Sequence, residues 1–149
     1  MDYFALAQEL SRIRRRMARI PDFRKFITPD DGESFVLGYL GERSNPISPK
    51  EIGDAMNVSS ARIATILNQL EEKKMVRRMA DPDDGRYTLI ELLPAGVDQR
   101  RKNAENFNLC AARFLEELGP QDAAEYVRLQ SRIADIYTAR LACGKKVAP

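Results

Sequence analysis

The chain has 149 residues, of which 24 are Lys or Arg and 22 are Asp or Glu, so its formal net charge is only +2. That length suffices for one domain with a buried core, with or without helical extensions, and the overall charge is too small to indicate nucleic-acid binding by itself. Because the sequence has no His and only two Cys, the usual catalytic triads, His-based metal sites and zinc fingers are excluded.

No segment predicts export or membrane insertion. We find no signal peptide, no apolar run long enough to cross a bilayer, and no repeat or low-complexity segment. Gly-rich phosphate loops, Ser-Lys pairs and paired-carboxylate signatures are also not recognisable. We therefore expect a cytoplasmic binding protein rather than an enzyme, without a cofactor, a metal site or contact with a membrane.

The first predicted element is an amphipathic helix from Asp2 to about Ile20, which Pro21 ends. Its apolar residues alternate in steps of four and three, at Leu6, Leu10, Ile13, Met17 and Ile20. Such a stripe is too short for an independent coiled coil, so it must pack on another helix of its own chain or of a partner. The remaining face is basic, and either solvation or contact with phosphate explains it: Arg12, Arg14, Arg15, Arg16 and Arg19.

A second helix is predicted from Asp30 to Arg43. Asp30 is its expected N-cap and Glu33 its partner in a capping box. Five apolar side chains are expected to be buried, which makes this helix a scaffold for the pair of helices after it: Phe35, Val36, Leu37, Tyr39 and Leu40. Ile47, after a Ser-Asn-Pro turn, can add a short third strand to the later hairpin.

The segment from Ser48 to Leu70 predicts two helices joined by a tight turn. Ser48 is the expected N-cap, with Pro at the first helical position and Glu51 completing a capping box. Asn57 tolerates the left-handed conformation that the turn requires, and Ser59 can cap the second helix. Helices joined so closely cross closely, which favours the small Gly53 at the crossing. This is the spacing of a helix-turn-helix.

The second of these helices has one apolar and one polar face. Ile63, Ile66, Leu67 and Leu70 form the stripe predicted to be buried. The opposite face carries Ala61, Arg62, Thr65, Asn68 and Gln69. Small polar side chains with one Arg suit a helix that must approach base edges and donate hydrogen bonds to them, although a plain solvated face is the alternative.

Two strand-like runs come next, at residues 74–79 and 87–92, around a loop rich in Asp, Pro and Gly. They predict a hairpin. Asp84 and Arg86 are close enough to pair and stiffen its tip, and such a wing can lie over a minor groove. An ordinary hairpin on a small domain is the alternative for the loop alone.

Two long helices end the chain, at residues 94–118 and 121–141, separated by Gly119 and Pro120. Their inward residues are expected to be Phe107, Cys110, Ala111, Phe114, Leu115 and Leu118 on the first, and Tyr126, Leu129, Ile133, Ile136 and Tyr137 on the second. Together with the N-terminal helix they carry more apolar surface than one small domain can cover. A symmetric homodimer would cover it.

Four segments carry a pattern found in a known family: the helix pair from Ser48 to Leu70, residues 70–76, the wing from Asp81 to Arg86, and the junction from Leu92 to Gly96. In them the sequence resembles the MarR family of bacterial winged-helix transcription regulators, over nearly the whole chain. The family usually has Gly where Lys74 stands, Arg where Thr65 stands and a basic residue where Gly85 stands. The DNA contacts that the family makes from the positions of Thr65 and Gly85 are therefore expected to be made by Arg62 and Arg86 instead.

The resulting prediction is a mostly α (α+β) winged helix-turn-helix with long N- and C-terminal dimerisation helices. One domain would span residues 1–149, with residues 30–92 binding DNA and residues 2–20 and 94–142 forming the dimer. The expected function is that of a homodimeric, sequence-specific regulator on double-stranded DNA, most simply a repressor. Phosphate contacts are assigned to Lys50, Ser59 and Ser60, and further DNA contacts to Ala61, Arg62, Thr65, Asn68, Gln69 and Arg86.

The resemblance also implies a small organic effector, often phenolic, between the dimerisation helices and the winged part. No motif marks the residues that would bind it. Two alternatives stay open beside a more distant enzyme: a winged-helix protein-interaction module that does not read DNA, and a regulator that senses redox state through Cys110. Because Cys110 lies on an apolar stripe with nothing nearby to lower its pKa, we expect it to act as a small hydrophobic residue.

Overall fold

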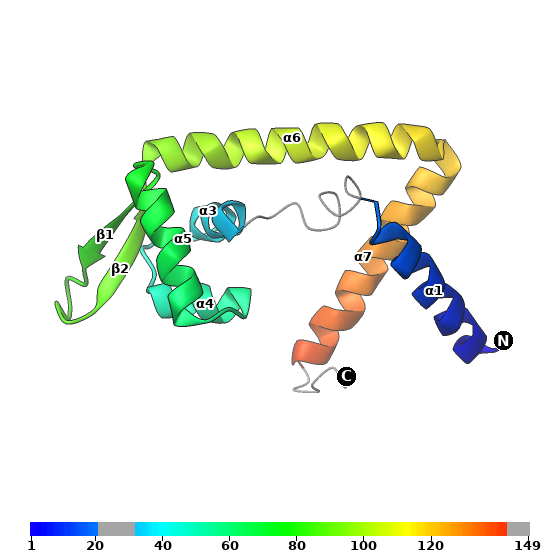
Figure 1. Cartoon of the computed structure of the whole chain (residues 1–149), viewed down its shortest axis with the longest axis horizontal. Coiled ribbons are helices and arrows are strands. Elements are labelled where there is room, and N and C mark those ends of the chain that lie inside the picture. Colours follow the sequence, from blue (N-terminus) through cyan, green and yellow to red (C-terminus); the bar gives the residue numbers. More distant parts are fainter. Residues whose placement is uncertain (21–31, 143–149) are drawn as a thin grey trace. The chain divides into compact units, whose positions relative to one another are not determined.

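The computed structural model describes residues 1–20 and 32–142, and the chain forms two compact units, residues 1–107 and 108–149. Six helices and a two-stranded antiparallel sheet are found in the described residues (Figure 1). They are α1 (Tyr3–Met17), α3 (Gly32–Gly41), α4 (Pro49–Met56), α5 (Ser60–Glu72), β1 (Val76–Ala80), β2 (Thr88–Leu92), α6 (Pro94–Leu118) and α7 (Pro120–Ala142). The prediction of a mostly helical winged helix-turn-helix is confirmed.

Local side chains fix the ends of α4 and α5 as predicted. Ser48 Oγ accepts from the backbone N–H of Glu51 at 3.2 Å, and Ser59 Oγ accepts from that of Arg62 at 3.3 Å. Asn57 ends α4 in the left-handed region, with φ 53° and ψ 45°. Of the two hydrogen bonds of the predicted capping box, only the one to Ser48 forms, because the Glu51 carboxylate instead accepts from Tyr39 Oη at 3.3 Å.

Gly53 is buried where α4 meets α5. A Cβ added there would lie 3.6 Å from Ile63 Cγ2 and 3.7 Å from the Val58 carbonyl oxygen, which are ordinary van der Waals distances. The crossing therefore needs a small residue, as the sequence predicts, but Ala would fit as well as Gly.

The hairpin pairs Val76 with Leu92 and Ala80 with Thr88. Its first strand begins two residues later than predicted, because Lys74 has a φ of 56° and cannot continue an extended strand. Ile47 adds one antiparallel bridge to Ile90, through two backbone hydrogen bonds of 2.8 and 3.2 Å. The third strand predicted there is thus a single bridge.

One hydrophobic core joins α3, α4, α5 and the hairpin. Three of the five residues predicted to be buried on α3 are in it, whereas Phe35 and Tyr39 are half-buried and stack on each other at 5.9 Å. Asp30 lies outside the described residues, and Glu33 bonds to Lys73 Nζ at 2.6 and 2.8 Å. The core residues are Val36, Leu37, Leu40, Ile47, Ile52, Ile63, Ile66, Leu67, Leu70, Val76 and Ile90.

The start of α6 is fixed against the strand ends. The Leu93 N–H donates to the Met75 carbonyl at 2.9 Å, and Gly96 is buried beside the same carbonyl. A Cβ on Gly96 would clash with that oxygen and lie 2.6 Å from Leu92 Cδ1, so this position requires glycine. Further along α6, Asn103 Nδ2 donates to Ser34 Oγ of α3 at 3.0 Å.

The second unit has little core of its own. Gly119, with φ 77°, separates α6 from α7, and Phe114 meets Tyr126 edge to face at 5.6 Å. None of the described side chains of α7 is buried. Cys110, predicted to lie inward, is exposed in the single chain. The same holds for four residues predicted to lie inward on α7, namely Leu129, Ile133, Ile136 and Tyr137.

The N-terminal helix α1 is shorter than predicted. Asp2 caps it, with Oδ1 accepting from the N–H groups of Phe4 and Ala5, and it ends at Met17. Ile13 and Met17 are half-buried, whereas Leu6 and Leu10 are about half exposed, at 53% and 49%. Part of its apolar stripe is therefore uncovered in the single chain.

Candidate nucleic-acid interface

The two faces of α5 differ as the sequence predicts. Its apolar stripe is buried in the core, with exposed fractions of 3% or less. The predicted DNA-binding residues of the helix and its cap are all exposed: Ser59, Ser60, Ala61, Arg62, Thr65, Asn68 and Gln69. The core thus holds α5 rigidly from behind and leaves one continuous polar face open.

The start of α5 can bind an anion. The first backbone N–H groups of a helix have no partner within the helix, and here Ser59 Oγ satisfies that of Arg62. The amides of Ser60 and Ala61 remain to donate to a phosphate, which the positive end of the helix dipole also favours. Lys50 is exposed in the first turn of α4. This is the geometry expected of phosphate contacts.

Arg62 is the cation of the open face. It is exposed, and no ion pair or side-chain hydrogen bond to it occurs among the described residues. Its guanidinium can therefore make a bidentate contact to a guanine edge without breaking a contact within the protein. Thr65 differs, because its hydroxyl donates to the Ala61 carbonyl at 3.0 Å and keeps only its lone pairs for other partners.

Asn68 is held by a residue that the sequence pattern did not assign to the site. Arg78, on β1, donates from Nη2 to Asn68 Oδ1 at 2.7 Å and pairs through Nη1 with the Glu71 carboxylate. The Arg78 backbone N–H also donates to Glu71 at 3.3 Å. Asn68 and Glu71 are three residues apart and so share a face of α5. In the sequence, the only sign of this contact was that spacing together with an Arg on the next strand.

The tip of the wing is closed by the predicted pair. Arg86 Nε and Nη2 donate to the two carboxylate oxygens of Asp84 at 2.9 and 2.7 Å. This hydrogen-bonded contact lowers the pKa of Asp84 and raises that of Arg86. Both groups therefore stay charged near neutral pH, and Arg86, whose side chain is 86% exposed, can still face a phosphate. A Cβ on Gly85 would meet nothing within 4 Å, so packing does not require glycine there.

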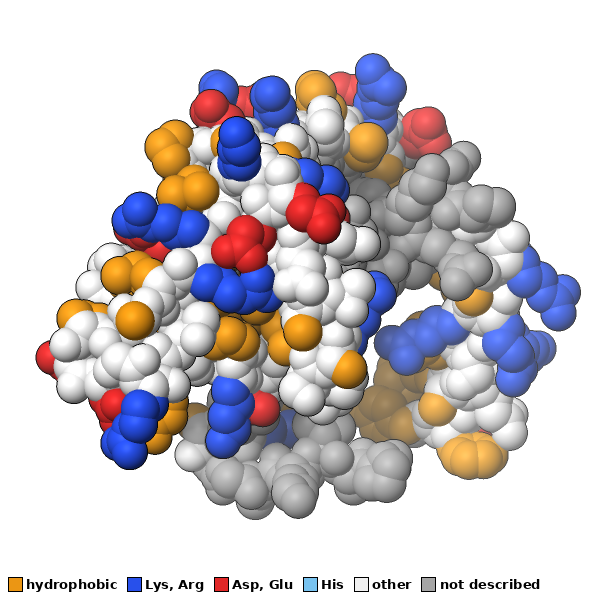
Figure 2. Space-filling model, turned by 60° about the vertical axis from the view of Figure 1, so that its left-hand side comes forward, with side chains coloured by type: hydrophobic (Ala, Val, Ile, Leu, Met, Phe, Trp, Pro, Cys, Tyr) orange, Lys and Arg blue, Asp and Glu red, His pale blue; other side chains and the backbone are white. Residues whose placement is uncertain are grey.

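Many basic residues of the winged-helix part lie beside acidic ones. Figure 2 shows Lys and Arg side chains over several parts of the visible face, with Asp and Glu beside some of them. Several pairs neutralise one another, including Arg77 with Glu91 and Lys73 with Glu33. A nucleic acid would therefore be recognised through the start of α5 and through cations without an ion pair among the described residues, such as Arg62.

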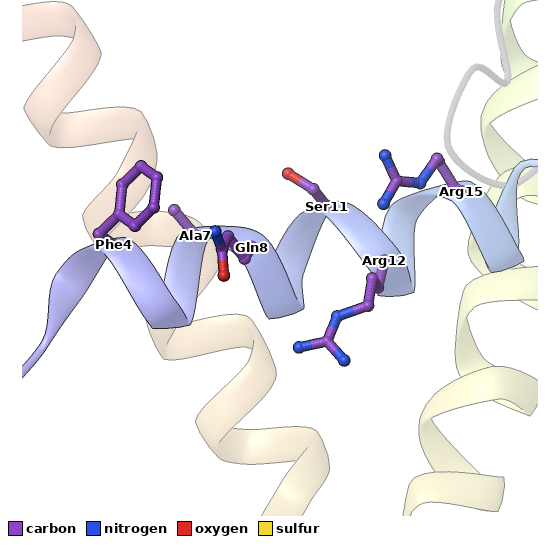
Figure 3. Close-up of a pocket in the computed structure, with 6 residues that line it drawn as sticks. All are labelled: Phe4, Ala7, Gln8, Ser11, Arg12 and Arg15. Carbon is purple, nitrogen blue, oxygen red and sulfur yellow. The ribbon is translucent and has the colours of Figure 1, made fainter.

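A hollow on α1 is a poor candidate for the expected effector site. Residues of α1 alone line it, along one exposed side of the helix (Figure 3): Phe4, Ala7, Gln8, Ser11, Arg12 and Arg15. Arg12 pairs with Glu9 at 2.7 Å. A ligand pocket ordinarily encloses most of its ligand, which one helix cannot do. The effector residues stay unassigned.

Neither a metal centre nor a membrane span is present in the part of the chain that the structure describes. No group of three or more Cys, Asp or Glu side chains there could hold a metal ion. No described helix is both long enough and apolar enough to cross a bilayer.

Comparison with known proteins agrees with this geometry. A model of the MarR family matches residues 27–86. The chain is 35% identical over 86 residues to an uncharacterized HTH-type transcriptional regulator, YdgJ, of Bacillus subtilis, which is 58% of this chain and 50% of that protein. It spans about half the length of the curated relatives it matches.

Solved structures share the fold along most of the chain. A MarR family protein from Bacillus stearothermophilus has a TM-score of 0.69 at 20% identity, with 93% of this chain and 99% of that chain covered. The MepR protein of S. aureus, solved as a DNA complex, has a TM-score of 0.57 at 18% identity, with 93% and 98% covered. Residues 27–86 are thus similar to the MarR family, and the winged-helix fold of the chain is that of solved MarR structures.

Proposed function

We propose that the protein is a transcription regulator that binds double-stranded DNA sequence-specifically, most simply a repressor that occludes a promoter. The observation that carries this is α5: its apolar face is buried in the core, while its opposite face is open, polar and carries Arg62, which has no ion pair among the described residues. Such a helix can enter a major groove without unfolding or losing a contact. That a structural neighbour, MepR, was solved as a DNA complex supports the proposal.

The exposed residues take different roles in this proposal. Lys50, Ser59 and Ser60 contact phosphates and set the orientation of the protein. The side chains of α5 read base edges, with Arg62 on guanine as the strongest contact. The wing adds phosphate attraction through Arg86 and does not read bases. The Arg86 guanidinium is already engaged by Asp84, and Gly85 offers no side chain to the minor groove.

We further propose a homodimer built on α1, α6 and α7. The support is the apolar surface that these helices leave exposed in one chain, including Leu109 at 60%, Val127 at 53% and Ile133 at 48%. Exposed apolar surface of this extent usually marks an interface. A two-fold dimer would place two α5 helices on half-sites about one helical turn, ~34 Å, apart.

A small organic effector and a cytoplasmic location complete the proposal, with binding rather than catalysis as the activity. The effector would act by favouring one arrangement of the dimer over another, since a ligand shifts an equilibrium only by its differential affinity. Binding of the effector would cause the dimer to release DNA.

Selection of duplexes from a random DNA pool tests the proposal. We expect the full chain to enrich two related half-sites about one turn apart, and to lose affinity as salt rises, because phosphate contacts release counterions. Sedimentation with a selected duplex should give two chains per duplex. A pool that shows no enrichment, with no salt-dependent binding, would instead favour a winged-helix module that binds protein.

A further inference from the structure

The contact between Arg78 and α5 determines which end of the Asn68 amide is free. Arg78 reaches the helix from β1, and its two terminal nitrogens are occupied by Glu71 and by Asn68. Its side chain is 32% exposed, so it is itself poorly placed to reach a base. Its position instead determines the orientation of the Asn68 side chain.

Chemistry settles the orientation of that amide. A guanidinium has five N–H donors and no acceptor, so the Asn68 atom 2.7 Å from Arg78 Nη2 must be the oxygen. One lone pair of that oxygen therefore accepts from Arg78, and the amide is held with its oxygen toward Arg78. The amide NH₂ group, with two donors, remains for a partner outside, and Asn68 is exposed.

We propose that Arg78 is a positioning residue that holds Asn68 so that its NH₂ group, rather than its oxygen, faces the major groove. This rests on the proposed function, because it supposes that α5 lies in that groove. An Asn recognises adenine best by accepting from N6 and donating to N7 at once, and that contact needs its oxygen. With the oxygen held by Arg78, Asn68 favours bases with acceptor edges, namely guanine at O6 and N7 or thymine at O4, and disfavours adenine and cytosine.

Single-base series on the selected duplex test this. The position that Asn68 faces is identified as the one at which Asn68→Ala removes the base preference. In Arg78→Ala the amide is free to turn, so at that position adenine should improve roughly tenfold relative to guanine, the size of a good bidentate contact. In the Asn68→Ala background, Arg78→Ala should leave the relative preferences unchanged.

A second variant covers the case in which Arg78→Ala does not fold. Asn68→Asp keeps an oxygen for Arg78 but removes the donors, so the guanine or thymine preference at that position should be lost while the melting temperature stays close to that of the parent. Retention of the preference in Asn68→Asp would overturn the inference. So would an Arg78→Ala protein that loses affinity equally for every base.

The outcomes separate this inference from the function on which it rests. If the parent chain enriches no sequence from the random pool, the proposed function itself is wrong. If the parent is sequence-specific but adenine gains nothing in folded Arg78→Ala, only the role of Arg78 is wrong. Fluorescence anisotropy at one salt concentration gives all the required dissociation constants.

Discussion

Replacing Lys74 by Gly should stabilise the winged-helix unit. Lys74 has a φ of 56°, a conformation that puts the Cβ of an L-residue too close to the following carbonyl oxygen. The backbone is held there, since the Lys74 N–H donates to the Glu71 carbonyl at 2.9 Å and the Met75 N–H to that of Leu70 at 2.9 Å. The side chain is exposed and has no ion pair among the described residues, so its removal breaks no contact.

Two opposing effects set the size of the gain. Relief of the left-handed strain is worth roughly 1–2 kcal/mol. Gly also gives the unfolded chain more freedom, which costs roughly 0.4–1 kcal/mol. The difference is a stabilisation of about 1 kcal/mol, or a rise in Tm of about 3 °C for a chain of this size.

Urea and thermal unfolding followed by circular dichroism would measure it. All proteins must be compared at one concentration, because association makes Tm concentration-dependent. Lys74→Ala is the matched control: it removes the same side chain but keeps the Cβ, and so keeps the strain. If Lys74→Gly is no more stable than Lys74→Ala, the left-handed backbone at this position does not strain the chain.

Three further outcomes are expected. Deletion of residues 121–149 should leave a poorly soluble or unfolded chain, since α7 covers apolar surface in the proposed dimer; a well-folded dimer of the truncated chain by sedimentation would contradict that assignment. Cys110→Ser should keep the DNA affinity and the peroxide response of the parent, so a peroxide-induced release that vanishes in the variant would reveal a redox role. Asp84 should titrate below its ordinary pKa of 3.8, because the bond with Arg86 favours the carboxylate. Any stabilisation from this pair is thus complete above the ordinary pKa and lost as pH falls through the lowered pKa. Carbon-detected NMR measures the titration midpoint of the Asp84 carboxyl, and a midpoint at or above the ordinary pKa would show that the pair does not form in solution.

The sequence predicted best those features that neighbouring residues decide. Ser48, Asn57 and Ser59 act within a few residues of themselves, and all three have their predicted roles in the structure. The buried stripe of α5 was also predictable, because period and apolar composition are local properties of the sequence. Gly at the position of Lys74, which the resemblance to the MarR family implies, would fit the φ of 56° found there.

Contacts between distant segments could not be predicted. Glu33 pairs with Lys73, 40 residues along the chain, a contact that its expected place in a capping box did not indicate. Arg78 meets Asn68 and Glu71 only because the hairpin folds back on α5, and no spacing in the sequence states which strand residue will face the helix. The DNA contacts and the dimer stay predictions, since each depends on a second molecule.

The central claim, that specificity resides on α5 and that the wing adds affinity, is tested most directly by comparing Arg62→Ala with Arg86→Ala. Dissociation constants would be measured on the selected duplex and on a scrambled one over a salt series. Arg62→Ala should cost about 1–3 kcal/mol on the selected duplex and relax the preference at one base position per half-site. Arg86→Ala should weaken binding to both duplexes alike and reduce the salt slope. If Arg86→Ala alters the sequence preference while Arg62→Ala leaves it unchanged, the roles assigned to helix and wing are reversed.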